Sequence, residues 1–195
     1  MRSDRIALFG GSFNPPHTGH VRIAKAAAQQ FGLSEVRWIP NLISPHKSDL
    51  DVVEARHRLA MTELAATDDP VFTVSDLEIQ RGGLSYSIET LRTVRSSLPE
   101  CRLYLLLGDD AYASFDTWLE PDEIRELAEL IVYPRSLAKM SEIKTTPGVH
   151  RLEGDHVNVS SSHVRSLISK GKPVEHLLPE SVRDYIVTHR LYLDS

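Results

Sequence analysis

The most constraining feature of the sequence is a short apolar run that ends in two glycines and is followed by a helix-forming segment. Residues 5–9 are mostly apolar, Gly10 and Gly11 end the run, and residues 18–31 are rich in Ala, Gln and Lys. Strands buried on both faces of a parallel sheet form such continuous apolar runs. The second segment is composed of good helix formers. The chain therefore starts with the first half of a strand–helix–strand unit.

Strands and helices continue to alternate along the chain. We expect strands at 35–40, 71–74, 102–107 and 130–133, with a short one near 157–159. We expect helices near 53–66, 87–98 and 121–128, a loop at 41–51, a turn at 81–83 and a functional loop at 108–110. This alternation predicts an α/β fold with a doubly wound, mostly parallel sheet. Residues 160–195 predict a C-terminal helical segment, with helices at 160–169 and 179–190, and we expect residues 1–195 to form a single domain.

The net charge, the cysteine content and the lack of long apolar stretches limit the classes of protein to which this chain can belong. The chain has 195 residues, a net charge of -5 and a pI near 6.0, without the basic character of a nucleic-acid-binding domain. Cys101 is the single cysteine, which excludes an intramolecular disulfide and fits a reducing compartment. No apolar stretch approaches the roughly 20 residues of a membrane span, and no signal peptide is apparent. We expect a cytoplasmic protein that binds neither nucleic acid nor membranes.

The first chemical motif is Gly10–His20, GGSFNPPHTGH, between the first strand and the first helix. Glycines let a backbone approach a ligand closely, and a helix start offers free N–H groups to a phosphate. His17 and His20 are three residues apart and fall on the same side of the opening turn, so both rings can face one polyphosphate. Two alternatives stay open: the histidines only cap and pack the helix, or they bind a metal with a third ligand that nothing nearby clearly supplies.

The second motif is a serine-rich helix start, Ser160-Ser161-Ser162, with Arg165 one turn in. Hydroxyls and unpaired N–H groups at a helix start bind phosphate oxygens, and Arg165 can reach the same anion. Taken alone, such a start is also an ordinary N-cap. Its coexistence with the first motif favours a phosphate site.

Together the two motifs resemble the paired signatures of nucleotidyltransferases related to class I aminoacyl-tRNA synthetases, and most closely those of bacterial nicotinate-mononucleotide adenylyltransferases. The resemblance covers most of the chain. It continues through the following residues, in the order that family has them: Pro40-Asn41, Pro45-His46-Lys47, Ser85–Thr90, Gly108-Asp109-Asp110, Trp118 and Tyr133-Pro134-Arg135. One departure is Ser87, at a position where threonine is commoner.

The resemblance implies a Rossmann-like fold and adenylyl transfer from ATP to nicotinate mononucleotide, in NAD biosynthesis. It implies catalytic roles for His17, His20 and Arg165. The ATP site would consist of Gly10, Gly11, Ser12, Phe13, His17, His20, Gly108, Asp110, Ser161, Ser162 and Arg165. The acceptor site would consist of Asn41, Lys47, Ser85, Tyr86, Ser87, Trp118 and Arg135.

Magnesium would travel with ATP and pyrophosphate, because no carboxylate cluster for a dedicated metal site is visible in the sequence. We expect the backbone N–H groups of residues 85–87 to be unpaired and to select the acid over its amide. A related adenylyltransferase that uses nicotinamide mononucleotide or phosphopantetheine, and a nucleotide-sensing module, are the alternatives. A homo-oligomer is compatible with the sequence.

Overall fold

The computed structural model describes residues 4–45, 52–67, 69–134, 146–154 and 159–193. The strands are β1 (Arg5–Gly11), β2 (Glu35–Pro40), β3 (Phe72–Val74), β4 (Arg102–Gly108), β5 (Glu129–Tyr133) and β6 (Val149–Arg151). The helices are α1 (Thr18–Phe31), α2 (Ala55–Ala66), α3 (Leu77–Arg81), α4 (Ser87–Ser97), α5 (Asp109–Ala113), the 3₁₀ helix η1 (Phe115–Thr117), α6 (Pro121–Leu127), α7 (Ser161–Ser169) and α8 (Glu180–Thr188). None of the described helices combines the length and the apolar character needed to cross a bilayer.

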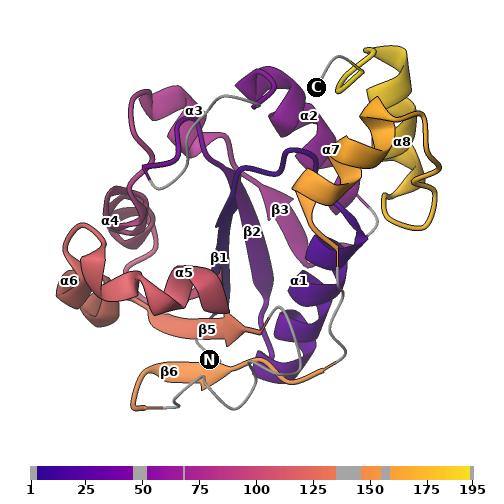
Figure 1. Ribbon diagram of the computed structural model, residues 1–195. Helices are drawn as coiled ribbons and strands as arrows, with labels where there is room; N and C mark the ends of the chain where they lie inside the picture. The colour runs from indigo at the N-terminus through magenta and orange to yellow at the C-terminus, as the bar shows by residue number, and fades with distance from the viewer. Residues whose placement is uncertain (1–3, 46–51, 68, 135–145, 155–158, 194–195) are drawn as a thin grey trace.

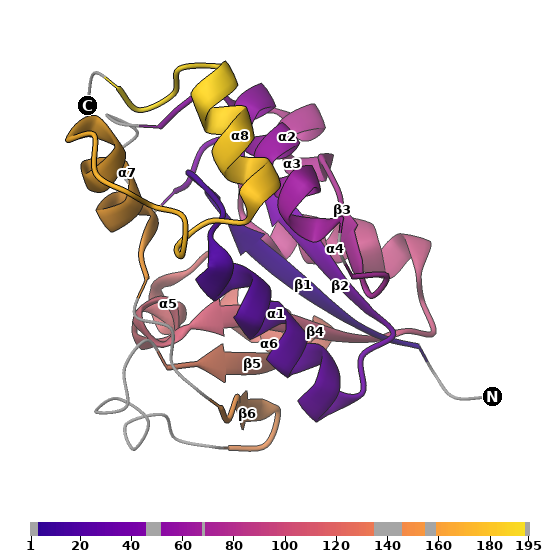
Figure 2. The ribbon, with the colours of Figure 1, turned by 90° about the vertical axis from the view of Figure 1, so that its right-hand side faces the viewer.

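The strands form one parallel sheet in the order β3-β2-β1-β4-β5-β6. The chain moves outward from β1 to β3, then returns to the other side of β1 with β4 and continues to β6. Helices α1 and α2 cover one face and α4 and α6 the other, as Figures 1 and 2 show. The predicted doubly wound α/β sheet is confirmed, and its order reverses between β1 and β4.

Alternating side chains on the central strands fill two cores. On β1, Ile6 and Leu8 pack toward α4 and α6, whereas Ala7 and Phe9 pack toward α1. Successive residues of a strand point to opposite faces, which explains why β1 has to be apolar throughout. Small residues of α1, including Ala24, are fully buried and let the helix lie close to the sheet.

The C-terminal helices pack on α2 rather than on the sheet. Their core contains Met61 and Ala65 from α2 together with Val164, Val182 and Ile186 from α7 and α8. Figure 1 shows α7 and α8 together beside α2, away from α4 and α6. The predicted C-terminal helical segment is therefore confirmed, and α2 links it to the sheet.

Three expectations about local structure are wrong. Residues 108–110 do not form a loop, because Gly108 ends β4 and α5 begins at Asp109. The sixth strand is β6, whereas Val159 lies outside any strand and 157–158 fall outside the described residues. The turn expected at 81–83 starts one residue later, because Arg81 ends α3. Gly82 and Gly83 then have φ of 77° and 71°, left-handed values that glycine tolerates without strain.

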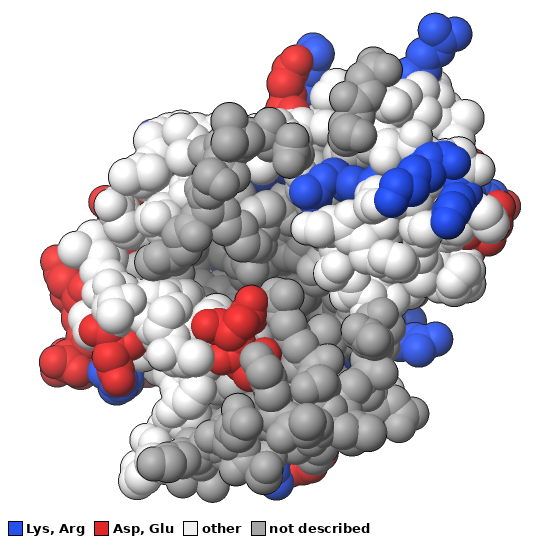
Figure 3. Space-filling view, in the orientation of Figure 1, with Lys and Arg blue, Asp and Glu red and all other residues white. Residues whose placement is uncertain are grey.

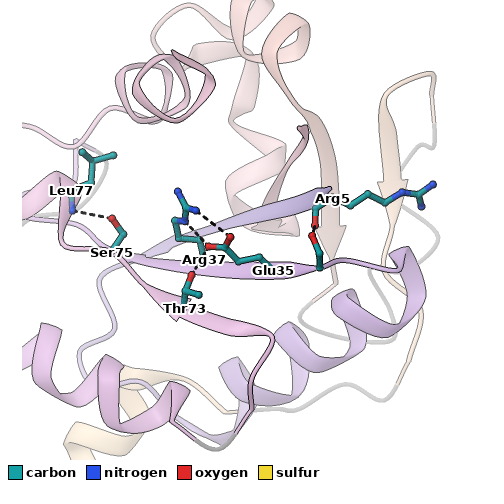
Figure 4. Close-up of polar contacts among 7 residues, drawn as sticks. Arg5, Glu35, Arg37, Thr73, Ser75 and Leu77 are labelled. Atoms are coloured by element: carbon teal, nitrogen blue, oxygen red, sulfur yellow. Dashed lines mark hydrogen bonds and ion pairs between the residues drawn. The ribbon is translucent and has the colours of Figure 1, made fainter. Parts of the chain in front are cut away.

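A carboxylate at the amino end of β2 joins this strand to β3, as Figure 4 shows. Glu35 accepts hydrogen bonds from Arg37, at 2.7 and 3.1 Å, and from Thr73, at 2.5 Å. Burial raises the pKa of Glu35, but these hydrogen bonds and the charge of Arg37 outweigh it, so the pKa is lowered overall. The ionised carboxylate holds the edge strand β3 in place.

Candidate active site

A large cleft lies beyond the carboxyl ends of the strands, where the sheet order reverses. Gly10 at the end of β1 and Gly108 at the end of β4 both line it, and its volume is about 1020 Å³. Ligands of open α/β sheets bind at such a reversal. Figure 3 shows a hollow in the middle of this face, with basic side chains toward α7 and acidic ones toward α5 and α6. The charge distribution favours an anionic group on the α7 side.

The structure brings the predicted site residues together. Within the described part of the chain, all of them line this cleft: Gly10, Gly11, Ser12, Phe13, His17, His20, Asn41, Ser85, Tyr86, Ser87, Gly108, Asp110, Trp118, Ser161, Ser162 and Arg165. Lys47 and Arg135 lie outside the described residues. The motifs at residues 10–20 and 160–165, far apart in the sequence, thus face the same space.

The two histidines hold each other at the start of α1. His20 donates its backbone N–H to His17 Nδ1 at 3.3 Å, and His17 donates its own to His20 Nδ1 at 3.1 Å. The rings stack with centroids 3.7 Å apart and planes 20° apart. A ring nitrogen that accepts a hydrogen bond carries no proton, so each neutral ring keeps its proton on Nε2. The capping role is therefore real, and it orients both rings as Nε2–H donors.

The two glycines of the first motif serve different purposes. A side chain at Gly11 would come within 3.1 Å of the Phe13 ring, whereas one at Gly10 would meet nothing within 4 Å. Gly11 thus makes room for Phe13, whose ring packs against Phe9 and Trp38 and is 2% exposed. Phe13 can contribute little more than backbone to a ligand, and the open approach is over Gly10.

The start of α7 is fastened to the loop between β1 and α1. Ser160 caps the helix by accepting the N–H of His163 at 3.2 Å, and Ser161 Oγ donates to Pro15 O at 2.8 Å. Arg165 donates to Asn14 O at 3.0 Å, its one hydrogen bond to protein among the described residues. Its other N–H donors are available to an anion in the cleft.

Residues beyond α7 hold the same loop. Thr18 donates its backbone N–H to Leu177 O at 2.9 Å and its hydroxyl to the same oxygen at 3.2 Å. Tyr192, which is 5% exposed, donates its hydroxyl to Asn14 Oδ1 at 2.8 Å. Burial raises the pKa of this hydroxyl, so it remains a donor. The C-terminal segment therefore fixes the loop that carries the histidines.

The segment before α4 differs from the expectation. Ser85 donates its N–H to Ile43 O at 2.9 Å, and Tyr86 donates its N–H to Leu84 O at 3.2 Å, so these two groups are not unpaired. The hydroxyl of Ser85 accepts the N–H of Leu42 at 3.0 Å. Ser85 is thus a structural link between the loop after β2 and α4.

Of the three backbone N–H groups expected to be unpaired at residues 85–87, only that of Ser87 agrees with the expectation. Tyr86, at the N-cap position, makes no side-chain capping bond, and Ser87 N–H has no acceptor among the described residues. Ser87 also lines the cleft. The anion-binding character of this wall therefore lies at the helix start itself.

Asp110 and Trp118 lie on the wall formed by α5 and η1. Asp110 is exposed in the first turn of α5, where its carboxylate can accept hydrogen bonds. Trp118 follows η1, and its ring lies 5.2 Å from that of Phe115 with planes 44° apart. Both residues line the cleft, Asp110 from α5, directly after β4, and Trp118 from the segment after η1.

The wall of the cleft also contains a buried acid, Glu78, which is not among the predicted site residues. Glu78 is 6% exposed and accepts the hydroxyl of Thr90 at 2.6 Å and a hydrogen bond from Ser85. Burial raises its pKa, opposed by these hydrogen bonds and by Arg81, and the pKa is raised overall. No motif marks this position. Further cleft residues outside the predicted site include Arg22, Ser44, Glu153 and Gly154.

The described residues do not supply a metal-binding cluster of their own. No group of three or more His, Cys, Asp or Glu side chains in residues 4–45, 52–67, 69–134, 146–154 and 159–193 is arranged to hold a metal ion. His17 and His20 therefore gain no third ligand from this part of the chain. The donor set of the cleft suits phosphate oxygens better than a cation.

Known proteins resemble this chain over almost its full length. Residues 8–167 match the cytidylyltransferase-like family. A probable nicotinate-nucleotide adenylyltransferase of Salinibacter ruber is 40% identical over 189 residues, covering 96% of this chain and 97% of the relative. One from Synechococcus sp. (strain JA-2-3B'a(2-13)) is 38% identical over 99% of both chains.

A solved structure agrees with the fold. Plasmodium falciparum nicotinic acid mononucleotide adenylyltransferase, in complex with NaAD, has a TM-score of 0.82 at 21% identity, over 97% of each chain. The Rossmann-like nucleotidyltransferase fold is thereby confirmed. The chain belongs to the cytidylyltransferase-like family, alongside its relatives named as nicotinate-nucleotide adenylyltransferases.

Proposed function

We propose that the protein transfers the adenylyl group of ATP to nicotinate mononucleotide, giving nicotinate adenine dinucleotide and pyrophosphate in NAD biosynthesis. The main observation in support is that the histidine motif and the serine–arginine motif line the same cleft. The hydrogen bond from Arg165 to Asn14 O joins the two motifs. Relatives of this name at 35–40% identity over nearly the whole chain support the same activity.

The reaction needs positioning and charge stabilisation from the protein. An oxygen of the acceptor's 5′-phosphate forms a bond to the α-phosphorus of ATP, while the bond to the bridging oxygen breaks and pyrophosphate leaves with its electron pair. No general base is required, because the attacking phosphate oxygen is already anionic. The Nε2–H groups of His17 and His20 donate to the phosphates, where charge develops in the transition state. Arg165 holds the β- and γ-phosphates.

ATP lies along the β1 and β4 side of the cleft in this proposal. Gly10 leaves room for the nucleotide above the strand end, and Asp110 accepts hydrogen bonds from the ribose. The triphosphate extends toward Ser161, Ser162 and Arg165, on the side where Figure 3 shows basic side chains. The orientation follows from the distribution of charge.

Nicotinate mononucleotide occupies the wall formed by the loop after β2, α4 and η1. Trp118 stacks on the pyridine ring and Asn41 contacts the nucleotide, with Lys47 and Arg135 proposed for its phosphate. The uncapped start of α4, at Ser87, receives the carboxylate. An amide there would present N–H₂ to N–H donors, which disfavours nicotinamide mononucleotide.

Magnesium is proposed to enter with ATP and to leave with pyrophosphate. Its ligands would be phosphate oxygens and water, consistent with the lack of a metal cluster among the described residues. When bound, the ion neutralises charge on the β- and γ-phosphates. We place the reaction in the cytoplasm, where Mg-ATP is available and a free thiol such as Cys101 stays reduced.

A single assay tests the proposal. Pyrophosphate release is measured with ATP and, in separate reactions, nicotinate mononucleotide, nicotinamide mononucleotide and phosphopantetheine, and the products are identified by mass spectrometry. The highest kcat/KM is expected for nicotinate mononucleotide, with nicotinate adenine dinucleotide as the product. Turnover with phosphopantetheine alone, or ATP binding without turnover, would replace the proposal with one of the two alternatives.

A further inference from the structure

We propose that Arg58 of α2 is a positioning residue that fixes the ATP side of the cleft relative to the acceptor side. The inference rests on the proposed function, because it concerns how the two substrates are aligned. Arg58 does not line the cleft. It acts through the backbone of residues that do.

The guanidinium of Arg58 binds several segments at once. Its NH1 donates to Ser12 O at 3.0 Å, to Asn41 O at 2.6 Å and to Asn41 Oδ1 at 3.2 Å. Its NH2 donates to Leu42 O at 3.0 Å and its Nε to Val53 O at 3.1 Å. Ser12 follows β1, Asn41 and Leu42 follow β2, and Val53 precedes α2. One side chain thus joins the loops that leave the two neighbouring strands.

The position of Arg58 is unusual for an arginine. The residue is 1% exposed, although arginine is among the residues least often buried. Burial of a charge is costly unless its hydrogen bonds are satisfied, so this arrangement depends on the carbonyls keeping their places. The guanidinium is planar and rigid, and it therefore fixes the direction as well as the length of each link.

The residues held by Arg58 face different substrates. Ser12 belongs to the predicted ATP site and Asn41 to the predicted acceptor site, and both line the cleft. Asn41 also donates its Nδ2 to Ser12 Oγ at 3.3 Å and its backbone N–H to Gly11 O at 3.0 Å. The separation of the two substrate sites therefore depends on a small network centred on Arg58.

In-line transfer is sensitive to this separation. The attacking oxygen and the α-phosphorus belong to different substrates, so a shift of one loop against the other misaligns them. A misplacement of about 1 Å can cost on the order of 100-fold in rate. A lysine keeps the charge but offers a single nitrogen, which cannot reach oxygens on all of these segments.

Arg58→Lys is the test, with Arg95→Lys as the matched control. Arg95 also donates to three backbone carbonyls, those of Pro99 at 3.1 Å, Cys101 at 2.6 Å and Leu127 at 2.7 Å, but it does not line the cleft. Steady-state kinetics are measured with each substrate varied, at a temperature where circular dichroism finds both variants folded. Arg58→Lys is expected to raise KM for ATP and for nicotinate mononucleotide and to lower kcat/KM by about 100-fold. Arg95→Lys is expected to stay within about 2-fold of the unmodified protein.

A second variant tests the proposal even if Arg58→Lys does not fold. Asn41→Ala removes the bridge to Ser12 Oγ but leaves Arg58 and its bonds to backbone carbonyls. It is expected to raise KM for ATP as well as KM for the acceptor, which a role in acceptor binding alone would not do.

The outcomes separate the two proposals. Arg58→Lys kinetics equal to those of the unmodified protein, or no worse than those of Arg95→Lys, would overturn the positioning role, as would an effect of Asn41→Ala on the acceptor alone. An unmodified protein that does not transfer adenylate to nicotinate mononucleotide would instead overturn the proposed function, before any variant is compared.

Discussion

At the scale of single residues, the histidine pair allows two roles to be assigned to the two nitrogens of each ring. The Nδ1 atoms of His17 and His20 close the first turn of α1, and in the proposed function the Nε2–H groups donate to phosphate. In that proposal, helix stability and catalysis depend on different atoms of the same side chains. Substitutions that keep one atom and remove the other can distinguish the two roles.

His17→Asn is expected to lower kcat by about 100- to 1000-fold without loss of stability. Asparagine is a preferred N-cap whose oxygen can accept the N–H that His17 Nδ1 accepts, but it lacks the Nε2–H donor. His17→Ala should show the same loss of kcat together with a helix less stable by about 1 kcal/mol. Steady-state kinetics and thermal melts of both variants check this. Near-normal turnover of His17→Asn would show that the two histidines serve only to cap the helix.

Arg165→Ala is expected to lower kcat more than it raises either KM, because a guanidinium on the leaving pyrophosphate is difficult for water to replace. Arg183→Ala is the control, since that arginine lies on α8 and pairs with Glu180 and Asp184. The measurement is kcat and KM for both substrates, with melting temperatures. A change confined to the melting temperature would show that Arg165 serves only to hold Asn14 O.

The sequence allows prediction of these motif residues but not of the residues that support them. His17, His20 and Arg165 stand out because a histidine pair and a serine-rich helix start are rare combinations at such junctions. Arg58 and Tyr192 do not stand out in the sequence. Arg58 binds mainly backbone carbonyls of loops, and Tyr192 binds the side-chain amide oxygen of one residue. Backbone acceptors are present at every position, so they leave no pattern in the sequence.

At the scale of secondary-structure elements, α4 provides a test of the choice between acid and amide. Ser87→Pro deletes the first N–H of the helix, and proline is well tolerated at this position. Tyr86 is already extended, with ψ of 129°, as a residue before proline has to be. We expect kcat/KM for nicotinate mononucleotide to fall by about 5- to 150-fold, and that for the amide to fall less.

Ser87→Ala is the control for this prediction, because it removes the hydroxyl and retains the N–H. Its ratio of kcat/KM for acid to that for amide should equal the ratio of the unmodified protein. Competition assays with both mononucleotides measure the ratio directly. If Ser87→Pro lowered kcat/KM for both mononucleotides equally, the start of α4 would have no part in selectivity.

The edge of the sheet should respond to acid through Glu35. Because the pKa of Glu35 is lower in the folded protein than in the unfolded chain, its stabilising contribution is complete above the ordinary carboxyl pKa and is lost as the pH falls through the folded value. Glu35→Gln should therefore be less stable at neutral pH and approach the unmodified protein below about pH 4. Urea unfolding at a series of pH values measures the difference.

Glu175→Gln, at an exposed position between α7 and α8, is the control for Glu35→Gln because it changes the charge equally. Its free energy of unfolding should follow that of the unmodified protein across the same pH range. A constant difference between Glu35→Gln and the unmodified protein at all pH values would contradict the role of the ionised carboxylate.

The length of a helix or strand largely determines whether it can be predicted from the sequence. Among the elements with several turns or long apolar runs, β2 and α1 have the predicted bounds to within about one residue, whereas β1 ends two residues later and α2 begins two residues later than predicted. The short α3, α5 and β6 were not predicted, because three to five residues are too few to show a period. Of these, β6 is an edge strand held by backbone pairing with β5, for which the residue types matter little.

At the scale of the whole molecule, the C-terminal segment lines the cleft through Ser161 and Arg165 and holds the histidine loop through Tyr192. Tyr192→Phe is expected to raise KM for ATP by about 5- to 10-fold, because it removes one buried hydrogen bond to Asn14 Oδ1. Tyr185→Phe, which removes a hydroxyl bonded to His57 Nδ1 at 3.0 Å on the same segment, should leave KM for ATP unchanged. Equal effects of the two variants would mean that the segment acts only through general stability.

The hydrogen bonds between the C-terminal segment and the histidine loop also set an order of events during synthesis. They join residues 146 to 178 positions apart, so the loop leaves the ribosome long before Ser161, Arg165 and Tyr192 do. At about 5–20 residues per second, that interval is roughly 7–36 s. The nascent chain therefore carries the histidine loop before the residues that hold this loop, Ser161, Arg165 and Tyr192, have been made.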